Sequence, residues 1–378
     1  MPFEISACRP EELPALLDLA DRVFRSRRSG AMEKEYPLLF HPDNLEQLRV
    51  IRAQGRPVSH VGVCLREGVI LGCRMGVASI GSVATAPDYR GGGMASALME
   101  DARRHSLERG VSLMLISGGR GLYHRLGYVP AGRFASLVAP AGTAPMTSGQ
   151  PRPCAAGDIL TVVGFHQREP VRYIRSLDDW RRLLNAGNLM NHPADLWIIE
   201  DGGVPVGYVA TQQPSSGPGP RSPVRAYEFA GARRAVAEAL PTLAAHYGAE
   251  EIEIVTQPDD AALLAEARRR DWRIGARGFP GTLGIIDGPA FFAALHPYLE
   301  ERWGRDLGGL ELEPLPEGAI FRRAGAEYRL ETRGLLTTLV FGGDVETARA
   351  LPPPPAPVAE ALRAAFPMPL LWYGYNYV

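Results

Sequence analysis

The first 140 residues alternate between stretches with the apolar period of a strand and stretches with that of a helix. The expected strands are residues 3–8, 60–66, 69–75, 77–85 and 111–117. The second and third of these strands form a hairpin whose turn is expected at Glu67 and Gly68. The expected helices are residues 11–25 and 94–108. This order of elements is typical of a mixed α/β domain.

A first domain boundary is expected at residues 140–153, which are rich in small residues and proline and have no apolar period. Beyond this boundary, a second block repeats the order of strands and helices as far as residue 269. A glycine loop opens the main helix of the first block, but residues 229–233 of the second block contain only one glycine. We therefore expect a second unit that is built like the first but lacks its loop.

The last block begins near residue 288 with an expected helix at residues 289–303. Strand-like runs follow at residues 318–323, 326–332 and 337–341, and a proline run then leads to a final helix. The chain ends in Leu-Leu-Trp-Tyr-Gly-Tyr-Asn-Tyr-Val, from Leu370 to Val378. Disordered ends lack such aromatic anchors, so we expect this tail to be buried.

Composition limits the class of protein. A chain of 378 residues with 46% hydrophobic residues predicts two or three globular domains. The formal net charge of −1 predicts no nucleic-acid partner. No run of about 18 apolar residues and no signal segment are found, which predicts a cytoplasmic protein without a membrane partner. The four cysteines lack the spacing of a zinc site, so no metal is expected.

Three successive glycines, Gly91, Gly92 and Gly93, follow an apolar strand and open a helix. Glycine allows a positive φ and a close approach of the backbone to a ligand. The first N–H groups of a helix are unpaired and lie at the positive end of its dipole, where a pyrophosphate binds well. Position 96 is serine, which excludes the Rossmann spacing, and no Gly-Lys-Ser/Thr follows, which excludes the nucleotide P-loop.

The pattern Arg90-x-x-Gly93-x-Ala95 after a strand, with the later segment from Tyr123 to Tyr128, resembles the coenzyme A loop of the GNAT superfamily of N-acetyltransferases. The whole chain resembles the Eis-type (enhanced intracellular survival) acetyltransferases of that superfamily. In those proteins a catalytic GNAT domain is followed by a degenerate GNAT domain and a sterol-carrier-protein-like domain, and the protomers form hexamers.

This resemblance implies a fold of the α/β and α+β classes. It places a catalytic GNAT domain at residues 1–139, a degenerate GNAT-like domain at residues 154–286 and a smaller sterol-carrier-protein-like α+β domain at residues 287–378. It also implies a homo-oligomer, with a hexamer as the form to expect.

The resemblance further implies acetyl-CoA as the co-substrate. The backbone of residues 83–85 is expected to bind the pantetheine arm, and residues 91–96 are expected to hold the pyrophosphate. The predicted acetyl-CoA residues are Val83, Ala84, Thr85, Arg90, Gly91, Gly92, Gly93, Met94, Ala95 and Ser96.

The chemistry requires a base and an acid. A lysine-like ammonium has a pKa of roughly 10.4 and must lose a proton before it attacks a thioester. Many GNAT enzymes carry a glutamate on the strand before the glycine loop, but residues 77–85 contain no carboxylate. Eis-type enzymes use the C-terminal carboxylate instead, and the resemblance assigns this role to Val378. It assigns the general acid to Tyr123, since a phenol with a pKa of about 10 can protonate the departing thiolate.

Two other residues of this segment are candidates for a role beside Tyr123. Tyr128 is expected to be structural, because it occupies the aromatic position after Gly127. His124 is the alternative base, although an exposed histidine at a helix start is the simpler interpretation.

Two functions from different classes remain open. One is an acetyl-CoA-dependent N-acetyltransferase that acts on a primary amine of a small molecule or peptide. The other is a non-catalytic protein that senses CoA or binds an apolar ligand. The intact loop and Tyr123 favour catalysis. The sequence does not distinguish aminoglycosides, polyamines, lysine side chains and peptide N-termini, which all present the same nucleophile.

Overall fold

The structure is a computed structural model that describes residues 3–25, 30–142, 149–214, 224–304 and 307–378. The chain divides into two compact units. The first unit consists of Met1–Gly132, Gly278–Leu371 and Val378, and the second of Arg133–Arg277 and Trp372–Tyr377. Within the described ranges, no helix combines the length and the apolar content needed to cross a bilayer.

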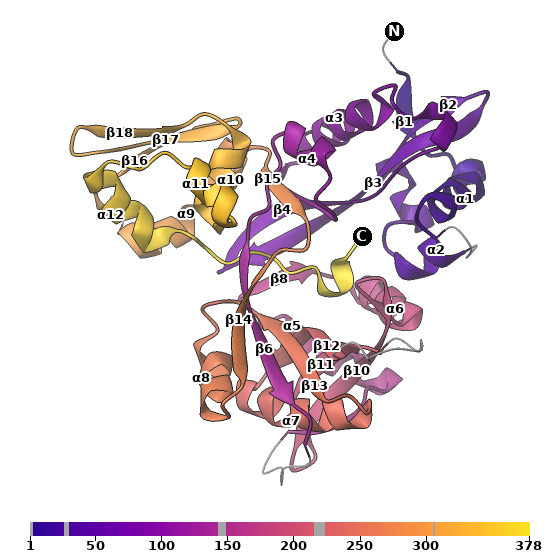
Figure 1. Ribbon diagram of the computed structural model, residues 1–378, viewed down its shortest axis with the longest axis vertical. Coiled ribbons are helices and arrows are strands. Elements are labelled where there is room, and N and C mark those ends of the chain that lie inside the picture. The colour runs from indigo at the N-terminus through magenta and orange to yellow at the C-terminus, as the bar shows by residue number, and fades with distance from the viewer. Residues whose placement is uncertain (1–2, 26–29, 143–148, 215–223, 305–306) are drawn as a thin grey trace. The chain divides into compact units, whose positions relative to one another are not determined.

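The first unit is built on a mixed sheet (Figure 1). Its strands lie in the order β1 (Ile5–Ala7), β2 (Leu48–Ala53), β3 (Arg56–Ile70), β4 (Cys73–Thr85), β5 (Val111–Ile116) and β15 (Thr282–Ile285). Strands β1 to β4 pair antiparallel, β4 pairs parallel with β5, and β15 pairs antiparallel with β5. The fold class predicted from the sequence, mixed α/β sheets with a further α+β region, is confirmed.

Helices cover both faces of this sheet (Figure 1). They are α1 (Leu13–Phe24), α2 (Ala31–Glu35), α3 (Met94–Leu107) and α4 (Gly121–Arg125). One face of α3 packs on the sheet. Its residues Leu98, Met99 and Ala102 form a cluster with strand residues such as Val63 and Ile80, and all five are almost fully buried. Burying a leucine or methionine side chain stabilises the fold by roughly 1.5–3 kcal/mol, so this face fixes α3 on the sheet.

The hairpin of β3 and β4 differs from the expectation. The turn lies at Leu71 and Gly72, whose φ angles of 50° and 84° suit a two-residue hairpin turn, and not at Glu67 and Gly68. Gly68 lies inside β3 opposite Met75, and a Cβ built on it would come within 2.5 Å of a Leu371 methyl carbon. This glycine therefore allows close packing and makes no turn.

Strands β4 and β5 separate before β4 ends. Their parallel register runs from Gly76 opposite Val111 to Ile80 opposite Ile116, and the Ser117 N–H donates to the Ile80 carbonyl at 3.0 Å. Strand β4 continues to Thr85, so its last residues have no β5 neighbour in this register. The sheet of the first unit therefore has an open backbone edge at residues 81–85.

The first unit also contains an α+β region. Its elements are α9 (Gly288–Trp303), the antiparallel strands β16 (Glu311–Leu315), β17 (Gly318–Arg323) and β18 (Ala326–Leu330), and the helices α10 (Arg333–Phe341), α11 (Val345–Ala350) and α12 (Ala356–Ala365). The strand expected at residues 337–341 is wrong, because these residues form the end of α10. The Thr338 hydroxyl donates to the Gly334 carbonyl at 2.8 Å, so the polar group of this β-branched residue is hydrogen-bonded within the helix.

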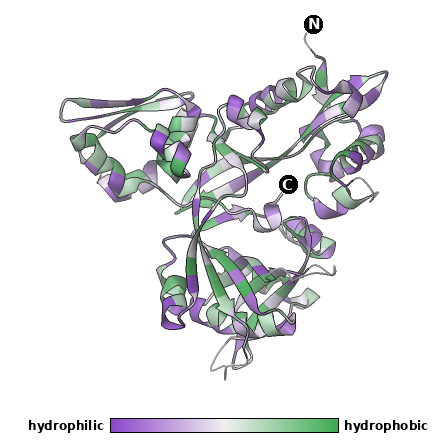
Figure 2. Cartoon of the chain, viewed as in Figure 1, coloured by the Kyte–Doolittle hydropathy of each residue, from purple (hydrophilic) through white to green (hydrophobic). Residues whose placement is uncertain are grey.

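The second unit has its own mixed sheet. Its strands lie in the order β14 (Arg273–Gly278), β6 (Arg133–Pro140), β13 (Glu251–Thr256), β12 (Val224–Gly231), β11 (Val204–Gln212), β10 (His192–Asp201) and β7 (Gln150–Pro153), and β9 (Asn188–Leu189) pairs with β10. The second unit also contains four helices and one short strand, namely α5 (Ile159–His166), α6 (Leu177–Ala186), α7 (Arg233–His246), α8 (Ala261–Arg269) and β8 (Val171–Ile174). Hydrophobic residues recur along the strands of this sheet (Figure 2).

Strands β6 and β15 each join a sheet other than that of the domain in which the sequence places them. Strand β6 precedes residue 140 but belongs to the second sheet, and β15 precedes residue 287 but pairs with β5 in the first. The compact units accordingly change over at Gly132 and Gly278.

Candidate active site

The glycine turn between β4 and α3 has the backbone geometry of an anion cradle. Gly91 and Gly93 have φ angles of 81° and 84°, and Gly93 is the N-cap residue of α3. A Cβ built on either glycine would meet nothing within 4 Å, so glycine is required here by the backbone conformation and not by crowding. The first hydrogen bond of α3 runs from the Ala97 N–H to the Gly93 carbonyl. The N–H groups of the three helical residues before Ala97 have no acceptor within the helix.

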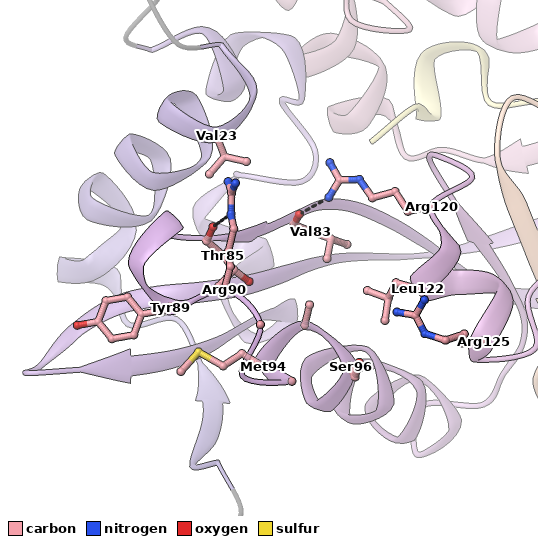
Figure 3. A pocket seen from close by; sticks show the side chains of 13 residues that line it. Val23, Val83, Thr85, Tyr89, Arg90, Met94, Ser96, Arg120, Leu122 and Arg125 are labelled. Carbon is pink, nitrogen blue, oxygen red and sulfur yellow. Dashed lines mark hydrogen bonds between the residues drawn. The ribbon is translucent and has the colours of Figure 1, made fainter.

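A cavity of about 600 Å³ opens beside this turn (Figure 3). Its lining residues are Val23, Val83, Thr85, Tyr89, Arg90, Gly91, Gly93, Met94, Ala95, Ser96, Arg120, Leu122 and Arg125. The lining therefore includes every predicted acetyl-CoA residue except Ala84 and Gly92. All of these residues belong to the first unit.

The end of β4 presents alternate backbone groups to the cavity. Ala84 lies opposite His60 of β3 and its carbonyl accepts from Ser59 Oγ at 3.2 Å, so its backbone faces the neighbouring strand. The carbonyls of Val83 and Thr85 instead accept from two arginines that line the cavity, Arg120 Nη1 at 3.5 Å and Arg90 Nε at 3.1 Å (Figure 3). Val83 and Thr85 thus offer the backbone groups that a pantetheine arm can use.

Three arginines give the cavity a positive lining. Arg90, Arg120 and Arg125 are exposed side chains, and no carboxylate is among the lining residues. Arginine binds phosphate through fixed, paired donors, so this lining favours a polyphosphate ligand. Arg120 and Arg125 are not among the residues predicted from the sequence. Their signal was their position on either side of Tyr123 in one short segment.

Tyr123 lies in α4 next to the cavity-lining Leu122 and is 2% exposed. Burial raises the pKa of its phenol above the ordinary value, and the Arg120 cation opposes that shift. The phenol is therefore protonated at neutral pH, as a proton donor must be. Its ring lies beside Gly118, where a built Cβ would be 3.7 Å from a ring carbon, just beyond the point where β5 leaves β4.

Tyr128 and His124 lie as the sequence analysis expected. The Tyr128 hydroxyl is buried and donates to the Met114 sulfur at 3.0 Å, and burial raises its pKa to about 12. His124 is an exposed residue of α4.

Val378, the last residue of the sequence, belongs to the first unit and lies against β4. Val378 is 3% exposed, and a Cβ built on Gly81 would overlap its carboxyl carbon and lie 2.7 Å from its carbonyl oxygen. Gly81 comes directly after Ile80, the last β4 residue paired with β5. The carboxylate and Tyr123 therefore both lie close to the point where the two strands separate, one beside each strand.

The residues before Val378 are held within the second unit. Arg175, whose side chain is 1% exposed, forms a two-pronged ion pair with Glu228 at 2.7 Å, and its Nε donates to the Asn376 side chain at 2.6 Å. Glu228 also accepts from the Tyr375 N–H at 3.1 Å. Burial would raise the pKa of Glu228, but Arg175 holds it at about 2. The tail is buried, as its aromatic content predicted.

No group of three or more histidine, cysteine, aspartate or glutamate side chains in the described part of the chain is arranged to hold a metal ion.

Comparison with known proteins bears on both the domain and the whole chain. Residues 4–131 match the family model of the acetyltransferase (GNAT) domain. A search of curated proteins finds no match.

Solved structures share the fold over nearly the full length. A GCN5-related N-acetyltransferase from Kribbella flavida is 17% identical with a TM-score of 0.67, over 98% of this chain and 97% of that one. A probable N-acyltransferase from Enterococcus faecalis V583 is 16% identical with a TM-score of 0.68, over 98% and 99%. Eis1 from Mycobacterium abscessus is 16% identical with a TM-score of 0.60, over 97% and 99%. At these identities the likeness establishes the fold.

Proposed function

We propose that the chain is an acyltransferase that transfers the acetyl group of acetyl-CoA to a primary amine of a small molecule or peptide, because residues 4–131 match the family model of the acetyltransferase (GNAT) domain. One observation carries the proposal. The glycine turn, the open edge of β4 and three arginines surround a single cavity in the domain that the family match covers.

The cavity supplies a binding role for each part of acetyl-CoA. Backbone N–H groups from Gly91 to Ser96, at the start of α3, hold the pyrophosphate. Arg90 and Arg125 add charge-assisted hydrogen bonds to phosphate oxygens. Val83 and Thr85 bind the pantetheine amides, in the manner of an added strand. The thioester then lies toward the point where β4 and β5 separate.

Transfer requires three proton movements. The Val378 carboxylate accepts a proton from the ammonium, and the neutral amine attacks the thioester carbonyl to form a carbon–nitrogen bond. The carbon–sulfur bond breaks, and Tyr123 protonates the departing thiolate of CoA. The acylated nitrogen gives its surplus proton to the phenolate that remains, and the protonated carboxyl group releases its proton to solvent.

The terminal base is tested by semisynthesis of a C-terminal amide. Amidation removes the charge of Val378 at nearly constant size, so acetyl-CoA still binds and turnover falls. Appending residues after Val378 is the second arm, since it displaces the carboxylate while keeping the aromatic tail. Normal turnover of the amidated protein across pH overturns the assignment and directs attention to His124.

The proposed activity is tested by following CoA thiol release from acetyl-CoA with a panel of amines. The panel contains an aminoglycoside, a polyamine, a lysine peptide and a peptide with a free N-terminus. Mass spectrometry of the amine identifies the acetylated product. We expect amine-dependent release with at least one class. Tight acetyl-CoA binding without turnover on any amine would instead support the non-catalytic CoA-binding alternative.

A further inference from the structure

Strand β4 contains a bulge at the place where the two halves of the proposed site meet. His60 of β3 pairs with Ala84 and Gly62 pairs with Gly81, so Ser82 and Val83 of β4 together stand opposite a single β3 residue. The residue before Ser82 is the glycine that touches the terminal carboxylate, and the residue after it lines the cavity. The conformation of Ser82 therefore determines the positions of both Gly81 and Val83.

Ser82 holds this bulge in a conformation that is costly for serine. Its φ is 52°, in the left-handed region that residues with a Cβ rarely adopt. Such a strained residue persists only when its surroundings impose it. The Ser82 hydroxyl lies 3.1 Å from Nε2 of His60, and this is the side-chain contact that ties the bulge to β3.

His60 is fully buried beside this bulge. Its side chain has no exposed surface, its ring packs against Phe40, and burial lowers the pKa of the imidazole to about 3, so it is neutral at physiological pH. Nδ1 has no hydrogen-bond partner among the described residues. Orphaned buried N–H groups are rarer than under-satisfied acceptors, which places the ring hydrogen on Nε2. His60 therefore donates to Ser82 Oγ.

We propose that His60 is a positioning residue of the acyltransferase site: its hydrogen bond to Ser82 locks the β4 bulge, and the bulge presents Gly81 to the terminal carboxylate and Val83 to acetyl-CoA. The proposal rests on the proposed function. Neither His60 nor Ser82 is assigned contact with a reacting atom, and both act through the backbone of β4.

Two substitutions at Ser82 separate the backbone from the hydroxyl. Ser82→Ala removes the hydrogen bond and leaves an unfavourable φ for alanine, so the bulge relaxes. Ser82→Gly removes the same hydroxyl but favours the left-handed φ. We expect the dissociation constant of acetyl-CoA to rise roughly fivefold or more in Ser82→Ala, the size expected from one lost hydrogen bond, and to rise less in Ser82→Gly. Calorimetric titration measures both, and kcat is expected to follow the same order.

A double-mutant cycle tests the route through His60. His60→Leu keeps an apolar side chain in the buried site but removes the donor, and we expect it to weaken acetyl-CoA binding as Ser82→Ala does. In the Ser82→Gly background it is expected to add little, because the bulge no longer needs the donor. His60→Gln retains a donor and is expected to recover part of the loss.

The outcomes are decisive. Equal losses of acetyl-CoA affinity in Ser82→Ala and Ser82→Gly would mean that the hydroxyl itself contacts the ligand. No loss of affinity in either variant would mean that the bulge does not need the hydrogen bond from His60. Either result overturns the proposal. An equal effect of His60→Leu in the two backgrounds also overturns it, and this arm remains available if Ser82→Ala does not fold. Because binding of acetyl-CoA is measured directly, these results are distinct from a failure of the proposed function, which shows as absent turnover in the unmodified protein.

Discussion

At the scale of single residues, the charge of Arg120 acts on the phenol of Tyr123. The phenol is buried and the guanidinium is exposed in the cavity lining. Burial raises the pKa of Tyr123, and the cation limits the rise by favouring the phenolate. The proposed general acid is thus kept protonated at neutral pH, and its pKa is lower than it would be without Arg120.

The first prediction concerns pH. Because the Tyr123 pKa lies above the ordinary value of 10.0, its ionisation should cause little loss of kcat between pH 7 and about pH 9. Arg120→Gln removes the opposing cation, so the pKa rises further. Tyrosinate absorbance, measured against the same titration of Tyr123→Phe, reports the shift. Arg125→Gln is the control, since Arg125 lines the cavity but is not a cause of the Tyr123 shift. An unchanged or lower Tyr123 pKa in Arg120→Gln would contradict the account.

The second prediction concerns Gly81. Gly81→Ala introduces a methyl group where the carboxyl group of Val378 lies, without altering any charge. Displacing a catalytic group by about 1 Å can cost roughly 100-fold in rate, so kcat is expected to fall by about that factor. Affinity for acetyl-CoA is expected to remain, because Gly81 does not line the cavity. Gly157→Ala, at an open position in the second unit, is the control. Full activity of Gly81→Ala would remove the carboxylate from the mechanism.

At the scale of elements, the turn between β4 and α3 is the proposed anion site. The third prediction is that Gly93→Val abolishes measurable acetyl-CoA binding in a calorimetric titration, because a β-branched residue is strained at a φ of 84° and intrudes on the phosphates. Gly72→Val is a matched control in the hairpin turn, with the same φ and equally open surroundings. It should share the loss of stability but keep the affinity. Equal affinities in the two variants would contradict the assignment.

The elements that the sequence predicted well are those fixed by local pattern. The apolar period of α3, the glycine turn and the strand that enters it depend on nearby residues, and the structure places them as expected. The hairpin turn was misplaced because Glu67-Gly68 has turn chemistry, whereas Gly68 is needed for contact with distant Leu371. Residues 337–341 were mistaken for a strand because their β-branched side chains are satisfied by tertiary contacts, such as the Ile285 N–H that donates to Thr337 at 3.0 Å.

Parts of the site depend on long-range contacts that no local pattern contains. The placement of Val378 against Gly81 joins positions almost 300 residues apart in the chain. The hydrogen bond between the side chains of His60 and Ser82 depends on a bulge that shifts the register of two strands. The resemblance supplied the role of the C-terminus, but its packing against β4 emerged only from the fold.

At the scale of the whole molecule, segments from distant parts of the chain meet around buried charges. Within the second unit, Arg175, Glu228 and the tail residues Tyr375 and Asn376 form one hydrogen-bonded cluster. The terminal residue Val378 follows two positions after Asn376 in the sequence. The stability of this cluster and the order of the tail are therefore linked.

The fourth prediction concerns that cluster. Glu228→Gln leaves the Arg175 cation buried without its partner, which is expected to lower the free energy of unfolding by about 3–5 kcal/mol. Urea unfolding measures the change, and Glu251→Gln, which breaks the exposed pair with Arg273, should cost no more than about 1 kcal/mol. The Glu228 pKa of about 2 is below its ordinary value of 4.5, so its contribution is complete above pH 4.5 and is lost as the pH falls toward 2. Equal costs for the two variants would contradict the predicted role of the cluster.

The most direct test of the central claim compares Tyr123→Phe with Tyr128→Phe in amine-dependent CoA release. Both substitutions remove one buried hydroxyl from the same short segment, but only Tyr123 is assigned to the reaction. The account predicts that Tyr123→Phe lowers kcat by about 10²–10⁴-fold with unchanged acetyl-CoA affinity, whereas Tyr128→Phe retains kcat. Wild-type turnover in Tyr123→Phe, or an equal loss in both variants, would contradict it.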